Sequence, residues 1–332
     1  MHERRMTEII VPGHAVRTSA VGFGCSSLTG TDPSNANRVL QAAFDAGVRH
    51  FDTARYYGYG EGEGILGRFL KGRRSEVTIT TKFGIEPPRR TTALGVGLYV
   101  GRRIVRLLPA LRGFLQRGTQ SLVKSSAFSA QQAQISLETS LRELSTDHID
   151  FYLLHDYIVN EQPPDELLAF LENTVKSGKI RSFGIGTSFG NVLQALQRQP
   201  QLCSVLQFQN SVLTRNSDYL PRGNSNRMVI THGALGGSYR SVLTFLESRW
   251  NVAKDWAAKI GCHRLDENTL SALMLNYAAD ANPKGLVLFS SRDPARVSRN
   301  VKAILESEFS PAQIAMFGEL VNQESPPIVA SA

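Results

Sequence analysis

The sequence predicts an α/β fold, specifically a closed (β/α)8 barrel of the TIM type, because of two observations. Short apolar or β-branched segments alternate with longer stretches of 3.6-residue periodicity, and this alternation occurs eight times in 332 residues. No low-complexity linker divides the chain, and barrels of this length are often single domains. We therefore expect one barrel domain over residues 1–332.

The predicted elements follow one another in the order that such a barrel requires. A β-hairpin over Glu8–Thr18, turning at Pro12-Gly13, precedes the first strand and is expected to close the bottom of the barrel. The predicted strands span Ala20–Gly24, His50–Thr53, Val77–Lys82, Ile149–His155, Arg181–Gly186, Val205–Gln209, Met228–Thr231 and Leu286–Ser290. The predicted helices span Ser34–Ala46, Glu61–Leu70, Ala130–Leu144, Asp165–Ser177, Asn191–Gln199, Tyr239–Lys259, Glu267–Asp280 and Pro294–Leu305.

Capping residues support several of these helix boundaries. Asp32-Pro33 and Asp293-Pro294 each place an acidic N-cap directly before a proline, which is favoured in the first helical turn. Gly47 and Gly178 follow the ends of their helices, where a left-handed residue is common.

Composition indicates an ordinary globular protein, with 42% hydrophobic and 20% charged residues. No apolar run reaches the roughly 18–20 residues of a membrane-spanning helix, and the N-terminus lacks the apolar region of a secretory signal. The cysteines, Cys25, Cys203 and Cys262, show neither metal-ligand spacing nor a disulfide framework, which fits a reducing compartment. We expect a cytoplasmic protein without a metal site.

The formal charge of +8 comes from one segment. No Asp or Glu occurs between Pro87 and Leu137, whereas eight Lys or Arg do, and the remaining 29 basic residues balance the 29 acidic ones. The charge therefore does not predict a nucleic-acid-binding face spread over the protein. We expect a basic insertion at about 86–128, after the third strand. It is either a solvated lid on the barrel rim or a peripheral contact to a membrane or protein through 89–117.

Four ionisable side chains stand where predicted strands end. Asp52 and Tyr57 lie in HFDTARYYG, Lys82 lies in TITTKFG and His155 lies in DFYLLHDY. Because the C-terminal ends of barrel strands converge on one face, we expect these groups to meet there. An ammonium stabilises phenolate, so Lys82, oriented by Asp52, is expected to lower the pKa of Tyr57 and make it a general acid. His155 is expected to donate a hydrogen bond to a substrate oxygen.

The chain resembles the aldo-keto reductase family from GFGCSSL to SSRDPARVSRN. FDTARYYGYGEGEGILGRFL is similar to the family signature Asp-Thr-Ala-x-x-Tyr-Gly, and TITTKFG, DHIDFYLLHDY and SGKIRSFGIGTS follow in the family's order. The resemblance implies that Tyr57 donates a proton, that Lys82 and Asp52 tune it, and that His155 orients a carbonyl. It also implies a small carbonyl or alcohol substrate and a nicotinamide cofactor, bound without a metal and without a Rossmann fold.

The phosphate end of the cofactor is expected at the last strand and the helix after it. Free N–H groups at a helix N-terminus attract phosphate, and the planar fork of Arg296 suits the 2′-phosphate of NADP, with Arg292 assisting. By the resemblance, Arg296 recognises that phosphate and Asn300 binds adenine. Ser290 and Ser291, from the same segment, belong to the expected site.

The nicotinamide end departs from the family pattern at two places. Gly186-Thr187-Ser188 stands where many members have Ser-Asn, so Thr187 or Ser188 is expected to hold the carboxamide together with the matching Gln207. His232 occupies the slot of an aromatic ring that stacks on the nicotinamide, and an imidazole can stack there or carry charge. Gly24 and Leu235 complete the expected set.

Two functional interpretations remain open. The favoured one is an NADP-dependent oxidoreductase that interconverts a carbonyl (aldehyde, ketone or sugar) and an alcohol, with Tyr57 as general acid or base and NAD as the alternative cofactor. The other is a non-catalytic nucleotide-binding sensor that docks a partner or membrane through the basic segment. We call the four ionisable residues Asp52, Tyr57, Lys82 and His155 the tetrad. The presence of all four favours the enzyme, because a binding module has no need for Lys82 beside Tyr57.

Overall fold

The computed structural model describes residues 8–28, 31–87, 128–159, 165–221, 226–324 and 326–327. Nearly all of the expected basic insertion, including the proposed contact segment 89–117, lies outside these residues. Among the described residues, no helix combines the length and apolar composition that crossing a membrane requires.

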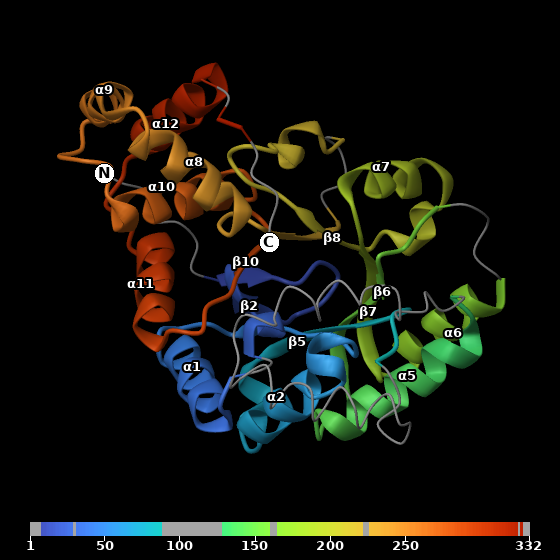
Figure 1. Ribbon diagram of the computed structural model, residues 1–332. Helices are drawn as coiled ribbons and strands as arrows, with labels where there is room; N and C mark the ends of the chain where they lie inside the picture. The colour runs from blue at the N-terminus through green and yellow to red at the C-terminus, as the bar shows by residue number, and fades with distance from the viewer. Residues whose placement is uncertain are drawn as a thin grey trace, which may run out of the picture.

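The described strands form the closed parallel barrel that the sequence predicts (Figure 1). The last strand pairs with the first, as Val287 lies opposite Val21, so the sheet has no edge. The strands in chain order are β3 (Val21–Gly24), β4 (His50–Asp52), β5 (Thr78–Phe83), β6 (Ile149–His155), β7 (Ile180–Gly186), β8 (Val205–Gln209), β9 (Met228–His232) and β10 (Leu286–Phe289).

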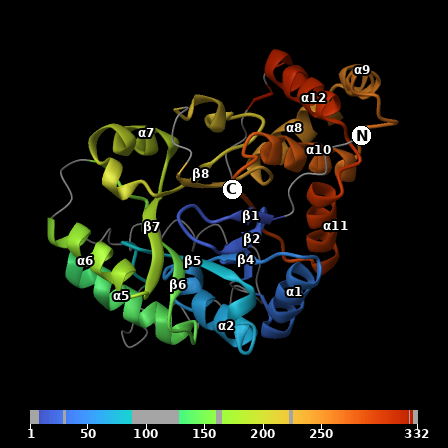
Figure 2. The same cartoon turned by 180° about the vertical axis from the view of Figure 1, so that it is seen from behind.

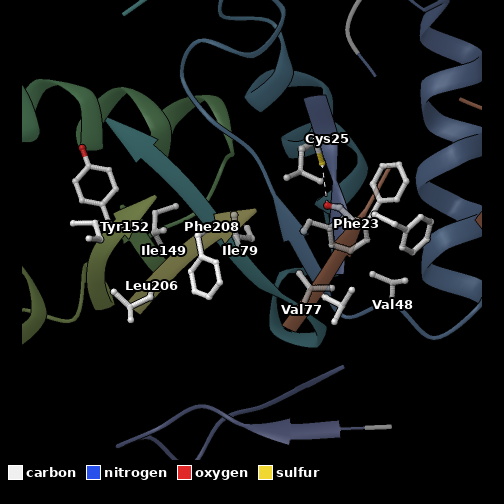
Figure 3. Packing of buried hydrophobic residues seen from close by; sticks show 14 of the residues in the cluster. Phe23, Cys25, Val48, Val77, Ile79, Ile149, Tyr152, Leu206 and Phe208 are labelled. Atoms are coloured by element: carbon white, nitrogen blue, oxygen red, sulfur yellow. Dashed lines mark hydrogen bonds between the residues drawn. The ribbon is translucent and has the colours of Figure 1, made fainter. Parts of the chain in front are cut away.

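Alternate residues of the strands face two different apolar layers, as the two-residue period of a strand requires. On β6, Tyr152 and Leu154 pack in the layer between barrel and helices, whereas Phe151 and Leu153 pack in the barrel interior. Figure 3 shows part of the outer layer, with Phe23 and Cys25 at one end and Tyr152 at the other. The barrel interior is therefore a packed core and not a pore.

The N-terminal hairpin closes the bottom of the barrel, which confirms the prediction. It consists of β1 (Glu8–Ile10) and β2 (Arg17–Ser19), paired antiparallel. Ile9 and Val11 pack against the interior residues Phe151 and Leu153. The Thr18 hydroxyl donates to the carbonyl of Arg49, just before β4, and Figure 2 shows the hairpin beside that strand.

The described helices surround the barrel (Figure 1). They are α1 (Pro33–Asp45), α2 (Gly62–Leu70), α5 (Ala130–Glu143), α6 (Asp165–Lys176), α7 (Phe189–Arg198), α8 (Gly237–Glu247), α9 (Trp250–Ile260), α10 (Glu267–Asp280), α11 (Pro294–Leu305) and α12 (Pro311–Glu324). Asp32 and Asp293 cap α1 and α11, and Gly47 and Gly178 have φ of 101° and 76°, as their positions after helices predict.

The sequence expectation of one helix over Tyr239–Lys259 is wrong, because the chain breaks at Ser248 and Arg249 into α8 and α9. The Ser248 hydroxyl donates to the carbonyl of Phe245, and Arg249 leaves helical geometry with ψ of 68°. The break lets α9 fold back onto α12, a helix that the sequence analysis did not predict, so that Trp256 packs with Phe317 in a second apolar cluster. Figure 1 shows α8, α9, α10 and α12 gathered on one side.

Candidate active site

The C-terminal ends of three neighbouring strands bring the four predicted catalytic side chains into one cleft of about 600 Å³. Asp52 ends β4, Lys82 is the last residue but one of β5, and His155 ends β6. Tyr57 begins the short 3-10 helix η2 (Tyr57–Tyr59), five residues beyond the end of β4. The convergence that the parallel barrel predicted is therefore present.

Local backbone contacts hold Tyr57 at the cleft. Its N–H donates to the carbonyl of Ala54 at 3.0 Å. Helix α2 starts directly behind it, where a Cβ on Gly62 would lie 3.0 Å from the Tyr57 carbonyl oxygen. A glycine at this position therefore allows the helix to begin against the tyrosine.

Lys82 is fully engaged at the centre of the site. Its Nζ donates to Asp52 Oδ1 at 2.7 Å and to the carbonyl of Thr53 at 2.9 Å, and lies 3.5 Å from the Tyr57 hydroxyl. The second carboxylate oxygen of Asp52 accepts from Gln207 Nε2 at 2.7 Å. Lys82 and Asp52 are each only 3% exposed, so the ion pair is buried and fixed in direction.

Burial and charge act in opposite directions on this pair of titrating groups. Burial lowers the pKa of Lys82, but Asp52 and Tyr57 together raise it above its ordinary value, so the ammonium is maintained. Burial raises the pKa of Tyr57 by more than the Lys82 charge lowers it. The sequence expectation of a lowered Tyr57 pKa is therefore wrong: the phenol is held protonated, with an ammonium ready to stabilise phenolate.

His155 is a neutral imidazole beside the tyrosine. Its ring lies perpendicular to that of Tyr57, with centroids 6.1 Å apart. Burial and the charge of Lys82 lower its pKa to about 3, against the opposing effect of Asp52. Its Nδ1 is buried and has no hydrogen-bond partner among the described residues. The ring therefore contains a buried polar atom that no described residue pairs.

A second cleft of about 670 Å³ adjoins the first and shares Leu235, Gly236 and Ser290 with it. Arg296 and Asn300, both predicted to bind the cofactor, line this second cleft. Asn300 is 4% exposed, and its amide Nδ2 has no partner among the described residues. The two clefts together form a trough from the tetrad to the start of α11.

Two other predicted cofactor residues do not line either cleft. Arg292 turns toward the loop after β3, where its Nε donates to the carbonyl of Ser27 at 2.9 Å. The Ser291 hydroxyl accepts from the N–H of Asp293 at 3.1 Å. Asp293 itself accepts from the N–H groups of Ala295 and Arg296, at 2.9 and 3.4 Å. The expectation that these N–H groups are free for a phosphate is therefore wrong, because an aspartate side chain already caps the helix.

The residues predicted around the nicotinamide line the first cleft, but several are already engaged. The Thr187 hydroxyl donates to the carbonyl of Tyr157 at 2.8 Å, and Ser188 caps α7. Gln207 uses its amide nitrogen on Asp52, which leaves its carbonyl oxygen as the group for a ligand. His232 and Gly24 also line this cleft.

Sequence reasoning missed Asp156 and Gln209, which line the first cleft too. Asp156 follows His155, and strand periodicity places consecutive side chains on opposite faces. Its presence in the cleft depends on a left-handed backbone, with φ of 52°. Gln209 is the last residue of β8 and pairs with His232 of β9. A search for polar residues at strand ends, which identified Asp52, Lys82 and His155, would therefore have identified Gln209 as well.

Comparison with known proteins identifies the family of this chain. The family model described as "Aldo/keto reductase family" matches residues 20–322. The aldo-keto reductase yakc of Schizosaccharomyces pombe, whose name specifies NADP(+), is 30% identical over 181 residues, which cover 53% of this chain and 44% of that protein. A D-threo-aldose 1-dehydrogenase of a Pseudomonas species is 28% identical over 209 residues, which cover 59% and 58%.

The fold extends further than these sequence matches. The chain spans about half the length of the curated relatives that it matches. The solved structure of a glycerol dehydrogenase of Gluconobacter oxydans covers 98% of this chain and 98% of its own, with a TM-score of 0.71 at 20% identity. Since the family model spans almost the whole sequence, from the first barrel strand to the last helix, the chain belongs to the aldo/keto reductase family.

Proposed function

We propose that this protein is an NADP-linked oxidoreductase that interconverts a carbonyl compound and an alcohol, with Tyr57 as the group that gives or takes the proton. One observation carries the proposal. Lys82 Nζ forms an ion pair with Asp52 Oδ1 at 2.7 Å and lies 3.5 Å from the Tyr57 hydroxyl. A buried cation that faces the hydroxyl of a protonated tyrosine stabilises the phenolate that proton transfer leaves behind.

Tyr57, Lys82 and His155 each have a separate role in the proposed reduction. NADPH, when bound, supplies the hydride that the carbonyl carbon accepts. Tyr57 gives its proton to the carbonyl oxygen as that oxygen becomes an alcohol, and Lys82 stabilises the phenolate that remains. His155, neutral because its pKa lies at about 3, orients the same oxygen through a ring N–H. In the reverse direction the phenolate accepts the alcohol proton.

The trough fits a dinucleotide. Its far end holds Asn300, whose buried Nδ2 has no partner among the described residues and suits a ring acceptor of adenine. Arg296 stands at the first turn of α11 in the same wall and suits the 2′-phosphate of NADP. Near the tetrad, the carbonyl oxygen of Gln207 suits the carboxamide N–H. The NADP(+) in the name of the Schizosaccharomyces pombe relative agrees with this assignment.

The test follows the absorbance of NADPH and NADH with a panel of aldehydes, ketones and sugars, for the wild type and Tyr57→Phe. We expect turnover by the wild type, preferentially with NADPH, and its loss in the variant. Tyr219→Phe is the matched control, because Tyr219 is 70% exposed and distant in sequence from the tetrad.

Two results would count against the proposal. Tight nucleotide binding without turnover on any panel member would support the non-catalytic sensor instead. Unchanged turnover by Tyr57→Phe would remove the tyrosine from the reaction.

A further inference from the structure

Asp156 is a carboxylate in the catalytic cleft that has no role in the reaction described above. It lines the same cleft as Tyr57, Lys82 and His155. Its side chain is exposed there and makes no hydrogen bond or ion pair with any described residue. A carboxylate that no described residue pairs, in the cleft of the proposed reaction, is a candidate for contacting the substrate.

The backbone conformation brings Asp156 to the cleft. Along β6, Phe151 and Leu153 face the barrel interior while Tyr152 and Leu154 face the helices, so a continued strand would turn Asp156 outward. Instead, Asp156 has φ of 52°, and its N–H donates to the carbonyl of Gly186 at 2.7 Å. This left-handed turn, which aspartate tolerates better than most residues, places His155 and Asp156 side by side at the cleft.

The two carboxylates of the cleft differ in charge balance. Asp52 is neutralised, because its two oxygens accept from Lys82 and Gln207, each at 2.7 Å. Asp156 has no such partner among the described residues, and partial burial raises its pKa while the more distant Lys82 charge opposes that shift. The described wall of the cleft thus holds one cation against two carboxylates.

The histidines do not restore the balance. The pKa of His155 lies at about 3, and burial lowers the pKa of His232. Both imidazoles are therefore neutral at neutral pH. Among the described residues of this cleft, an anionic carbonyl compound therefore meets an excess negative charge at Asp156.

We propose that Asp156 is a specificity-determining residue that accepts hydrogen bonds from hydroxyl groups of the substrate and repels anionic carbonyl compounds. The substrate class is then neutral hydroxylated aldehydes and ketones, sugars included. A carboxylate only accepts hydrogen bonds, so its partner on the substrate must be a donor such as a hydroxyl group. This inference rests on the proposed function, because it takes the carbonyl oxygen to lie between Tyr57 and His155.

The test compares three-carbon substrates in the wild type and Asp156→Asn, with NADPH as reductant. Asparagine keeps the shape and tolerates the left-handed backbone, but it removes the charge. We expect the ratio of kcat/KM for glyceraldehyde over propionaldehyde to fall about tenfold in the variant. The kcat/KM for propionaldehyde should stay within about twofold, and that for pyruvate should rise because the repulsion is gone.

Asp147→Asn is the matched control, since Asp147 precedes the opposite end of β6 and its side chain is 93% exposed. An unchanged ratio in an active Asp156→Asn enzyme overturns the inference and leaves the proposed function intact. A greater loss for 3-aminopropanal than for glyceraldehyde also overturns it, because the carboxylate would then select a cation. Absence of turnover by the wild type with every substrate, with NADPH or NADH, rejects the proposed function and this inference with it.

Discussion

Two buried ion clusters stand at opposite ends of the barrel and differ in how completely their polar atoms are paired. At the bottom, near the start of β6, one oxygen of Asp150 accepts from Arg74 Nη2 and from the N–H of Ile79, both at 2.8 Å. Its other oxygen accepts from Arg181 Nε at 2.6 Å. Asp150 is 1% exposed, and both of its carboxylate oxygens are occupied.

At the top, Lys82 and Asp52 are both buried, but the groups around this ion pair lack some of their hydrogen-bond partners among the described residues. The Tyr57 hydroxyl lies 3.5 Å from Lys82, which is a long contact, and His155 Nδ1 has no partner among the described residues. The bottom cluster joins neighbouring strands, whereas the top cluster presents reactive atoms to a cleft. A buried polar atom without a partner is costly, so the contrast between the paired oxygens of Asp150 and the unpaired Nδ1 of His155 supports the proposed active site at the top.

Tyr57→Phe has the largest expected effect and tests whether the top cluster serves activity and not stability. The kcat should fall about a thousandfold, because the proposed proton donor is lost. The free energy of unfolding should change by less than about 1 kcal/mol, because among the described residues the hydroxyl makes only one long contact. Steady-state assays and urea unfolding measure the two quantities, with Tyr219→Phe as control. A strong loss of stability would show that the top cluster is structural too.

Asp150→Asn is expected to do the reverse. Two arginines lose their carboxylate, so the free energy of unfolding should fall by about 4 kcal/mol. The kcat of the folded fraction should stay within about twofold, because the change is at the other end of the barrel. Urea unfolding of this variant beside Asp147→Asn separates the buried carboxylate from an exposed one. Equal stability of the two variants would contradict the structural role.

A third effect concerns His50, which lies inside the barrel between the two clusters. Its ring nitrogens pair with the hydroxyls of Thr78 and Thr80 at 2.8 and 3.1 Å. Burial lowers its pKa from 6.5 to about 4, although Asp52 and Asp150 oppose this shift. Below pH 6.5 the unfolded chain therefore binds a proton that the folded protein excludes.

The stability that depends on His50 is complete above pH 6.5 and is lost as the pH falls toward 4. The expected loss is about 3 kcal/mol, from a pKa difference at 1.36 kcal/mol per unit. Urea unfolding at a series of pH values should show a flatter acid limb for His50→Gln than for the wild type. Parallel curves would mean that other groups carry the acid sensitivity.

Arg296→Ala has the smallest expected effect. It tests whether nucleotide binding can be weakened without a change in proton transfer. The Kd for NADPH should rise about tenfold, whereas the Kd for NADH should not change, because only NADPH carries the 2′-phosphate. The kcat at saturating NADPH should be unaffected. Fluorescence titration provides the measurement, and Arg198→Ala, an exposed arginine at the end of α7, is the control. An equal rise for both nucleotides would contradict the phosphate assignment.

Much of the fold and the tetrad was predictable because the signals are local. Apolar runs that end at Asp52, Lys82 and His155 mark the strands, and parallel topology brings their ends to one face. The break between α8 and α9 was missed, because helical periodicity continues across Ser248 while its hydroxyl bonds back to Phe245.

Details of the site were predicted less well, because they depend on which of several partners a side chain takes. Arg292 has the chemistry of a phosphate ligand but donates to Ser27. Asp293 occupies N–H groups of α11 that were expected to be free. No sequence pattern indicated the left-handed backbone that turns Asp156 into the cleft.

The sequence by itself determined the barrel, the strand ends and the residues that meet at the catalytic face. It also contained the identity of the acid, the phenol, the amine and the imidazole. Only the tertiary structure decided their protonation, because the pKa of Tyr57 is the difference between burial, which raises it, and the Lys82 charge, which lowers it. Burial and distance both arise from residues remote in the chain, so no local pattern can supply their balance.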